Sequence, residues 1–356
     1  MQAIEEQFRL AIVAASAAGT PLRLRGGGSK DWHGQQLEGD VLDTRAYAGI
    51  IDYEPTELVI TARCGTPLAE IEAALAERQQ MLAFEPPHFG QGATIGGVVA
   101  SGLSGPRRAA AGALRDFVLG AVLMDGRGER LAFGGQVMKN VAGYDVSRLL
   151  AGSLGTLGLI LEVSLKVLPL PPREVTVAFE RAEIAALRLL NEWAGKPLPI
   201  SASCWHDGIL TLRLSGAEAA VAAALRSLGG EVVEPAQAAL FWTAVREQRH
   251  AFFSGDGSLW RLSLPPHASA VILKGRQLIE WGGAQRWLKL DGETDAAGAQ
   301  RIRQTVAASG GHATLFRGGD KSVGVFHPLA PAVAQIHQRL RLSFDPASIF
   351  NRHRMY

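Results

Sequence analysis

The stretch GQGATIGGVVASGLSG, residues 90–105, has six glycines among sixteen residues, where the chain-wide content of 41 in 356 predicts about two. Glycine has no Cβ and adopts positive φ, so such a loop can wrap an anion and direct several N–H groups at it. Thr94 precedes an apolar run, which predicts a loop entering a helix, and helix N-termini favour anions. A tight turn packed against a neighbour would explain the stretch equally well.

The composition predicts an ordinary globular protein, with 47% apolar and 20% charged residues and a net charge of +2. The absence of a dense Lys/Arg run argues against a nucleic-acid partner. No run reaches the roughly 18 apolar residues of a membrane span. Glu5 and Glu6 stand where a signal peptide carries basic residues, and two distant cysteines show no metal spacing. We therefore expect a cytoplasmic protein with reduced thiols.

A second glycine cluster, RGGGS at residues 25–29, follows an alternating strand at residues 22–25. It is typical either of a pyrophosphate clamp or of a flexible hairpin. It matches neither the GxGxxG fingerprint nor the Walker A motif. A third cluster, Gly152, Gly155 and Gly158, precedes an alternating strand that starts near Leu161.

The remaining pattern predicts further elements. Thr66 is expected to cap a helix whose first residue is Pro67, and Pro331 to open a final helix that reaches Leu342. From residue 173 onward, strands alternate with helices, with a hairpin folded at residues 207–208 and a late strand at residues 323–326. This half reads as an antiparallel sheet with covering helices.

Three motifs carry a resemblance when taken together: RGGGS, GATIGG and GYDVSRLLAGSLGTLGLI. In this order they resemble the FAD-binding module of the vanillyl-alcohol oxidase type, also called the PCMH type, and they cover residues 20–170. The segments PLRLRGGGSKDWHG and FFSGDGSLWRLSLP, with the ending FNRHRMY, are similar to the family of FAD-binding E subunits of glycolate oxidase. The resemblance implies an α+β fold. It has a two-part FAD-binding domain (1–170), an α+β cap with an antiparallel sheet (173–330) and a tail that returns to the FAD domain (331–356).

The resemblance also implies FAD as cofactor and assigns its contacts by motif. The expected cofactor-binding residues are Arg25, Gly26, Gly27, Gly28, Ser29, Gly92, Ala93, Thr94, Ile95, Gly96, Gly97, Ser101, Gly105, Gly155, Gly158, Ile160 and Asn351, with Arg354 as a further candidate in the tail. The family has Pro-Gly between that Asn and Arg, whereas this chain has Arg352 and His353.

The function that the resemblance implies is that of an FAD-dependent oxidoreductase subunit in a glycolate oxidase complex, which oxidises glycolate, a small 2-hydroxy acid, to glyoxylate. Its expected partners are a catalytic flavoprotein subunit and an iron–sulfur subunit. The location would be cytoplasmic, with peripheral placement at the inner membrane through the complex as an alternative.

Catalytic residues are not predicted. Larger relatives carry an HxGDGNxH-like motif, and the nearest run here, residues 254–258, contains no His and suggests no metal site. His33, His88 and His206 are candidate bases, and Arg107 and Arg108 are candidate carboxylate ligands or a solvated pair. A non-catalytic flavin-holding, electron-relay or assembly subunit, with the chemistry in a paralogous partner, therefore stays open.

Overall fold

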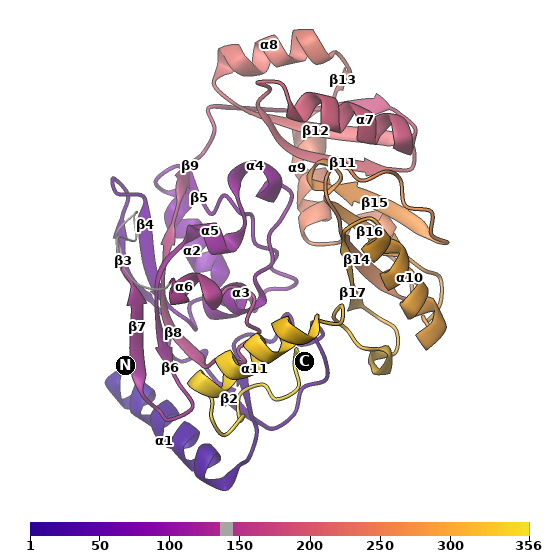
Figure 1. Cartoon of the computed structure of the whole chain (residues 1–356). Coiled ribbons are helices and arrows are strands. Elements are labelled where there is room, and N and C mark those ends of the chain that lie inside the picture. The colour runs from indigo at the N-terminus through magenta and orange to yellow at the C-terminus, as the bar shows by residue number, and fades with distance from the viewer. Residues whose placement is uncertain (136–144, 356) are drawn as a thin grey trace. The chain divides into compact units, whose positions relative to one another are not determined.

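The computed structural model describes residues 1–135 and 145–355. The chain forms two compact units, the first comprising Met1–Leu103, Ala113–Pro169 and Pro328–Tyr356, and the second Ser104–Gly112 and Leu170–His327. Gly143 and Tyr144, which open the third predicted motif, lie outside the described residues. Each unit has its own sheets and its own covering helices (Figure 1).

Unit 1 is built on a five-stranded sheet of order β3-β4-β8-β6-β7 and a parallel pair, β1-β2. Its strands are β1 (Leu22–Arg25), β2 (Asp40–Asp43), β3 (Ile50–Glu54), β4 (Val59–Arg63), β5 (Gln80–Met81), β6 (Val118–Met124), β7 (Arg130–Gly134), β8 (Leu159–Lys166) and β9 (Leu168–Pro169). Its helices are α1 (Gln2–Ala18), α2 (Leu68–Ala76), α3 (Ile95–Ser101), α5 (Leu114–Phe117), α6 (Val146–Leu149) and α11 (Pro331–Phe344).

Apolar periodicity explains how these elements pack. Leu161, Val163 and Leu165 of β8 are buried, and the alternate residues of that strand are half-buried. Helix α3 buries Ile95 and Val99. The predicted alternation along β8 and the predicted helix after Thr94 are thus confirmed, as is the start of α11 at Pro331.

The prediction for the start of α2 was wrong by one residue. The helix begins at Leu68, and Pro67 occupies the N-cap position. The Thr66 hydroxyl instead donates to the Arg63 carbonyl (2.7 Å) and accepts from the Gly49 N–H (2.9 Å). Thr66 is fully buried, so these tertiary partners replace the helix N–H groups that a capping hydroxyl would accept from.

Unit 2 is an eight-stranded antiparallel sheet of order β13-β10-β12-β11-β15-β16-β14-β17. Its strands are β10 (Arg173–Glu180), β11 (Ile200–His206), β12 (Ile209–Gly216), β13 (Glu231–Val232), β14 (Leu259–Ser263), β15 (Arg276–Glu280), β16 (Gln285–Lys289) and β17 (His312–Arg317). Its helices are α4 (Arg108–Ala111), α7 (Glu183–Ala194), α8 (Glu218–Leu228), α9 (Pro235–Arg246) and α10 (Ala296–Ala308), with 3-10 turns η1 (Ala251–Phe253), η2 (Trp281–Gly283) and η3 (Lys321–Val323).

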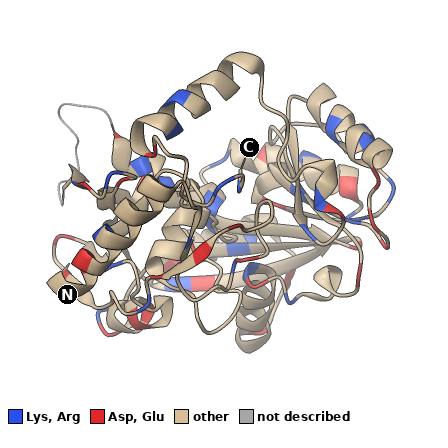
Figure 2. Ribbon diagram, turned by 90° about the horizontal axis from the view of Figure 1, so that it is seen from below, with Lys and Arg blue, Asp and Glu red and all other residues tan. Residues whose placement is uncertain are grey.

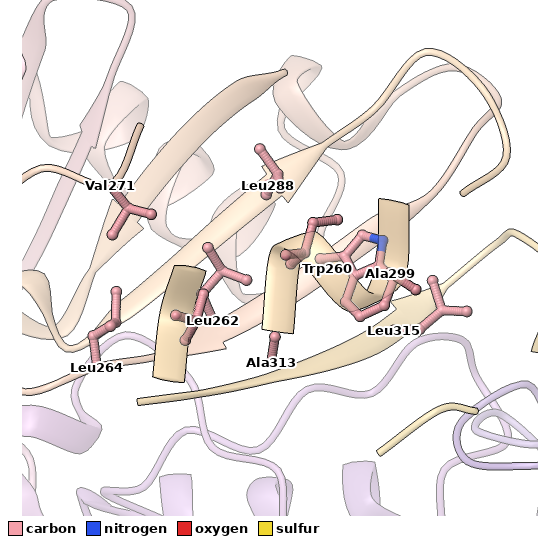
Figure 3. Close-up of a cluster of buried hydrophobic side chains, with 10 residues drawn as sticks. Trp260, Leu262, Leu264, Val271, Leu288, Ala299, Ala313 and Leu315 are labelled. Atoms are coloured by element: carbon pink, nitrogen blue, oxygen red, sulfur yellow. The ribbon is translucent and has the colours of Figure 1, made fainter. Parts of the chain in front are cut away.

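The core of unit 2 lies between this sheet and its helices. Trp260 and Leu262 of β14 pack with Leu288 of β16 and with Ile302 and Val306 of α10 (Figure 3 shows Trp260, Leu262 and Leu288). The α+β fold with an antiparallel sheet in the second half is confirmed.

Two local predictions for unit 2 had different outcomes. The hairpin folds at Asp207 and Gly208, both with positive φ, as expected for a two-residue turn. The strand expected at residues 323–326 was wrong, because the 3-10 turn η3 occupies its start and Gly324 has a φ of 80°. The edge strand of the eight-stranded sheet in this part of the chain is β17, which ends before η3.

We expect unit 2 to lose stability as the pH falls. Burial lowers the pKa of His250, His312 and His327 from the ordinary 6.5. The unfolded chain therefore takes up protons first, and stability present above pH 6.5 is lost progressively below it. Glu183, whose pKa burial raises, acts in the opposite direction, but nearer pH 4.5. Thermal unfolding from about pH 7.5 to 5.5 should show a falling Tm. An unchanged pH dependence in a triple His→Gln variant would contradict this cause.

Candidate functional site

The glycine clusters of unit 1 meet around one cavity of about 120 Å³. Its walls are the loop after β1, the start of α3, the segment before β8 and the C-terminal tail. The sequence-predicted residues that line it are Arg25, Gly26, Gly27, Gly28, Ser29, Thr94, Gly96, Gly97, Ser101, Gly155, Gly158, Ile160, Asn351 and Arg354. Four segments that are distant in sequence therefore contribute to a single site.

Unused backbone donors line this cavity. Among the residues that the structure describes, the N–H groups of residues 26–29 and of Gly97 donate to no protein acceptor. Residues 26–29 are half-buried and Gly97 is exposed, so these donors are open to a ligand. A run of free N–H groups in a glycine loop, followed by the first turn of a helix, is the arrangement that binds a phosphate.

Close packing of two loops explains why this site needs glycine. A Cβ on Gly27 would lie 1.4 Å from the Gly92 carbonyl oxygen, and a Cβ on Gly26 would lie 2.2 Å from the Thr94 Oγ1. Gly96 has a similar constraint, because its Cβ would lie 2.6 Å from that of Cys64. The two predicted cofactor loops thus touch through backbone, and side chains at these positions would separate them.

One carboxylate holds two of the cationic side chains near the cavity. Asp31 Oδ2 accepts from Arg23 Nη2 (2.7 Å) and from Arg25 Nε (2.8 Å). Arg25 and Lys30 line the cavity along with Arg354, and Asp31 is the only acidic residue in the described lining. The lining is therefore net positive, as suits an anionic ligand.

Arg354 brings a buried guanidinium to the cavity from the tail. Its Nη2 donates to the carbonyls of Lys30 and Asp31, both at 3.1 Å, and its Nη1 is buried without a hydrogen-bond partner. Burial lowers the pKa of Arg354 to about 10, so the group stays charged near neutral pH. An unpaired buried donor of this kind fits a ligand oxygen.

Asn351 fastens the tail to the rest of the site. Its Oδ1 accepts from the Leu24 N–H (2.9 Å), its Nδ2 donates to the Leu154 carbonyl (2.6 Å), and its own N–H donates to the Leu22 carbonyl. His353, at the position where the resembled family has Gly, has a φ of 59°. The side chain of Asn351 thus links the strand before the glycine loop to the third glycine cluster.

Four predicted residues do not line the cavity. Gly92, Ala93 and Ile95 lie behind it, where Gly92 packs on Gly27 and Ala93 accepts from the Leu68 N–H. Gly105 belongs to unit 2, and its carbonyl accepts from Trp281 Nε1 (3.1 Å). Gly105 is therefore not part of the described lining.

Sequence reasoning missed several members of the lining. Leu24, Lys30, Asp31, Leu37, Thr44, Cys64, Ala100, Leu154 and Leu159 also contribute. Burial raises the pKa of the Cys64 thiol to about 12, so this side chain lines the cavity as an uncharged thiol. Only Lys30 and Asp31 had a usable signal, since they directly follow the RGGGS motif.

The candidate bases and carboxylate ligands lie apart. His33 lines the cavity, while His88 Nε2 pairs with Glu72 Oε2 at 2.8 Å. His206, in unit 2, contacts the Gln277 carbonyl through Nδ1. Arg107 forms an ion pair with Glu174 at 2.7 Å, and Arg108 stacks on Trp281. No group of three metal-ligating side chains occurs in the described ranges.

Comparison with known proteins gives concordant matches. The family described as FAD binding domain matches residues 3–134. "Glycolate oxidase subunit GlcE" of Escherichia coli K12 is 49% identical over 355 residues, covering 100% of this chain and 97% of that protein. The D-lactate dehydrogenase of Archaeoglobus fulgidus is 32% identical over 207 residues, covering 55% of this chain and 44% of that enzyme. "Glycolate oxidase subunit GlcD" of Bacillus subtilis is 36% identical over 108 residues, covering 30% and 23% of the two chains.

A solved structure of alkyldihydroxyacetonephosphate synthase resembles the fold, with a TM-score of 0.68 at 14% identity. The superposition covers 98% of this chain and 74% of that one. Among the described residues, no helix has both the length and the apolar content that a bilayer crossing needs.

Proposed function

Because the chain belongs to the family of glycolate oxidase subunit GlcE, we propose that it is the FAD-binding subunit of a glycolate oxidase complex, which oxidises glycolate to glyoxylate. The observation that supports this most strongly is the run of free N–H groups at residues 26–29 and Gly97 around a net-positive cavity. Such donors fit the pyrophosphate of FAD. The cavity, at about 120 Å³, is assigned to that part of the cofactor alone.

Bound FAD would supply a two-electron acceptor for oxidation of a 2-hydroxy acid. The glycine loop and the first turn of α3 would hold the pyrophosphate through backbone N–H groups. Asp31 orients Arg25 beside that loop, and Arg354 offers its unpaired Nη1 to a cofactor oxygen. Asn351 acts as a positioning residue, because its side-chain oxygen and nitrogen both already form hydrogen bonds with protein backbone.

A flavin-holding and electron-relay role is the second candidate. The run at residues 254–258 has no His to take up the hydroxyl proton of a substrate, and Arg107, the candidate ligand for its carboxylate, is engaged by Glu174. In this version, a paralogous flavoprotein subunit oxidises glycolate and an iron–sulfur subunit receives the electrons. We place the complex in the cytoplasm, consistent with free Cys64 and Cys204, or at the inner membrane through its other subunits.

Anaerobic mixing with glycolate separates the two roles. The purified, FAD-loaded chain alone should show no bleaching of its flavin absorbance if it is a relay, because the substrate is then oxidised by the partner subunit. Bleaching should appear when the partner flavoprotein subunit is added. Rapid bleaching of the isolated chain would instead assign the substrate chemistry to this subunit. Absence of bleaching in the assembled complex with glycolate would overturn the proposed function.

A further inference from the structure

A second cavity of unit 1, of about 660 Å³, lies beside α11 and is larger than the cavity assigned to the pyrophosphate of FAD. It is bordered by α11, by residues 149–157 and by the end of the tail. Its walls combine apolar side chains, including Leu157, Leu329 and Met355, with basic ones. This is ample space for several side chains of another molecule.

The basic residues of this cavity are not neutralised by its lining. Arg115, Arg341 and Arg354 line it along with two histidines, and its described lining contains no Asp or Glu. Arg341 Nε is buried without a hydrogen-bond partner. Arg115 forms no ion pair within the described part of the chain. A concave surface with one sign of charge concentrates its field and favours an anionic partner.

Helix α11 is independent evidence that this face is covered. None of its 14 residues is buried, although it carries the apolar residues Val333, Ile336 and Leu342, which are 41%, 63% and 42% exposed. Its charged residues, Arg339 and Arg341, are both basic (Figure 2). Most helical stability in proteins comes from burying an apolar face, which α11 does not do against the residues that the structure describes.

We propose that α11 and the adjoining cavity form the docking groove for an acidic, amphipathic segment of another subunit. This rests on the proposed function, which places the chain in a multisubunit enzyme. Acidic side chains of that segment pair with Arg115 and Arg341, and its apolar residues pack on Leu157, Leu329 and the exposed face of α11. The groove thus combines an apolar centre with charge complementarity, which together give affinity and orientation.

The shape of the surface favours a protein segment over a lipid surface. A helix that lies on a membrane presents a convex apolar face, whereas here the basic groups line a hollow beside the helix. A segment with projecting side chains fills such a hollow.

Two pairs of matched variants test the groove in the co-expressed complex. Arg115→Glu reverses a charge in the cavity, and Arg226→Glu reverses one on the exposed face of α8 in unit 2, outside the cavity lining. Ala334→Trp fills the cavity, and Ala223→Trp adds the same bulk at an exposed position of α8. We expect Arg115→Glu and Ala334→Trp to weaken subunit assembly by about tenfold or more, with FAD content unchanged, and both controls to assemble normally.

Equal assembly of all four variants would overturn the docking groove while leaving the proposed function intact. Failure of the wild-type chain to assemble with its partner flavoprotein would instead reject the proposed function. Cavity variants that assemble normally but no longer bind vesicles of phosphatidylglycerol and phosphatidylcholine would also overturn the proposal, because the surface would then serve a membrane.

Discussion

Gly27→Ala is expected to abolish stable FAD binding. The added methyl group would lie 1.4 Å from the Gly92 carbonyl oxygen, so the two cofactor loops must move apart. Their separation misaligns the free N–H groups of residues 26–29 with those at the start of α3. A loss of about 3 kcal/mol in cofactor binding corresponds to more than a hundredfold in affinity. The flavin absorbance of the purified variant, compared with protein concentration, measures this loss.

Gly195→Ala is the matched control for this change. Gly195 ends α7 with a φ of −85°, and a Cβ there would meet only the Glu192 carbonyl at an ordinary 3.7 Å. This variant should retain wild-type flavin content. If Gly27→Ala binds FAD as tightly as Gly195→Ala, the contact between the two glycine loops does not shape the cofactor site.

Asn351→Ala should destabilise unit 1 and weaken FAD binding together. The change leaves the Leu24 N–H and the Leu154 carbonyl without their partner in a buried site. Each unsatisfied buried group costs about 1–3 kcal/mol, so we expect a loss of roughly 2–4 kcal/mol in the free energy of unfolding. Thermal unfolding of the FAD-free and FAD-loaded protein measures both effects.

His353→Gly provides the contrasting variant two residues away. Its φ of 59° is a conformation that glycine adopts without strain, so this change should leave stability equal or slightly higher. A Tm for Asn351→Ala that matches that of His353→Gly would show that the amide of Asn351 does not hold the tail in place.

Much of this architecture is visible in the sequence, because local chemistry determines it. The glycine clusters at residues 26–28 and 96–97 follow a strand and open a helix, and Pro331 starts α11. These features depend on neighbours in the chain. The family resemblance then identified the cofactor, which the FAD binding domain match and the GlcE relative confirm.

What the sequence did not predict depends on contacts between distant segments. Thr66 looked like a helix cap, but partners at Arg63 and Gly49 take its hydroxyl. Gly105 lies four residues after the end of α3, yet its carbonyl accepts a hydrogen bond from Trp281 in unit 2. Asn351 hydrogen-bonds to Leu24 and to Leu154, which lie 327 and 197 positions away from it in the sequence. No local pattern indicates such a pairing.

Direct cofactor titration tests most simply whether the glycine loops of unit 1 bind FAD. The wild-type chain, purified and mixed with FAD, should bind one FAD per chain, measured by flavin released on denaturation after removal of free cofactor. A wild-type protein that is purified colourless, is folded by thermal unfolding and takes up no FAD would contradict the account.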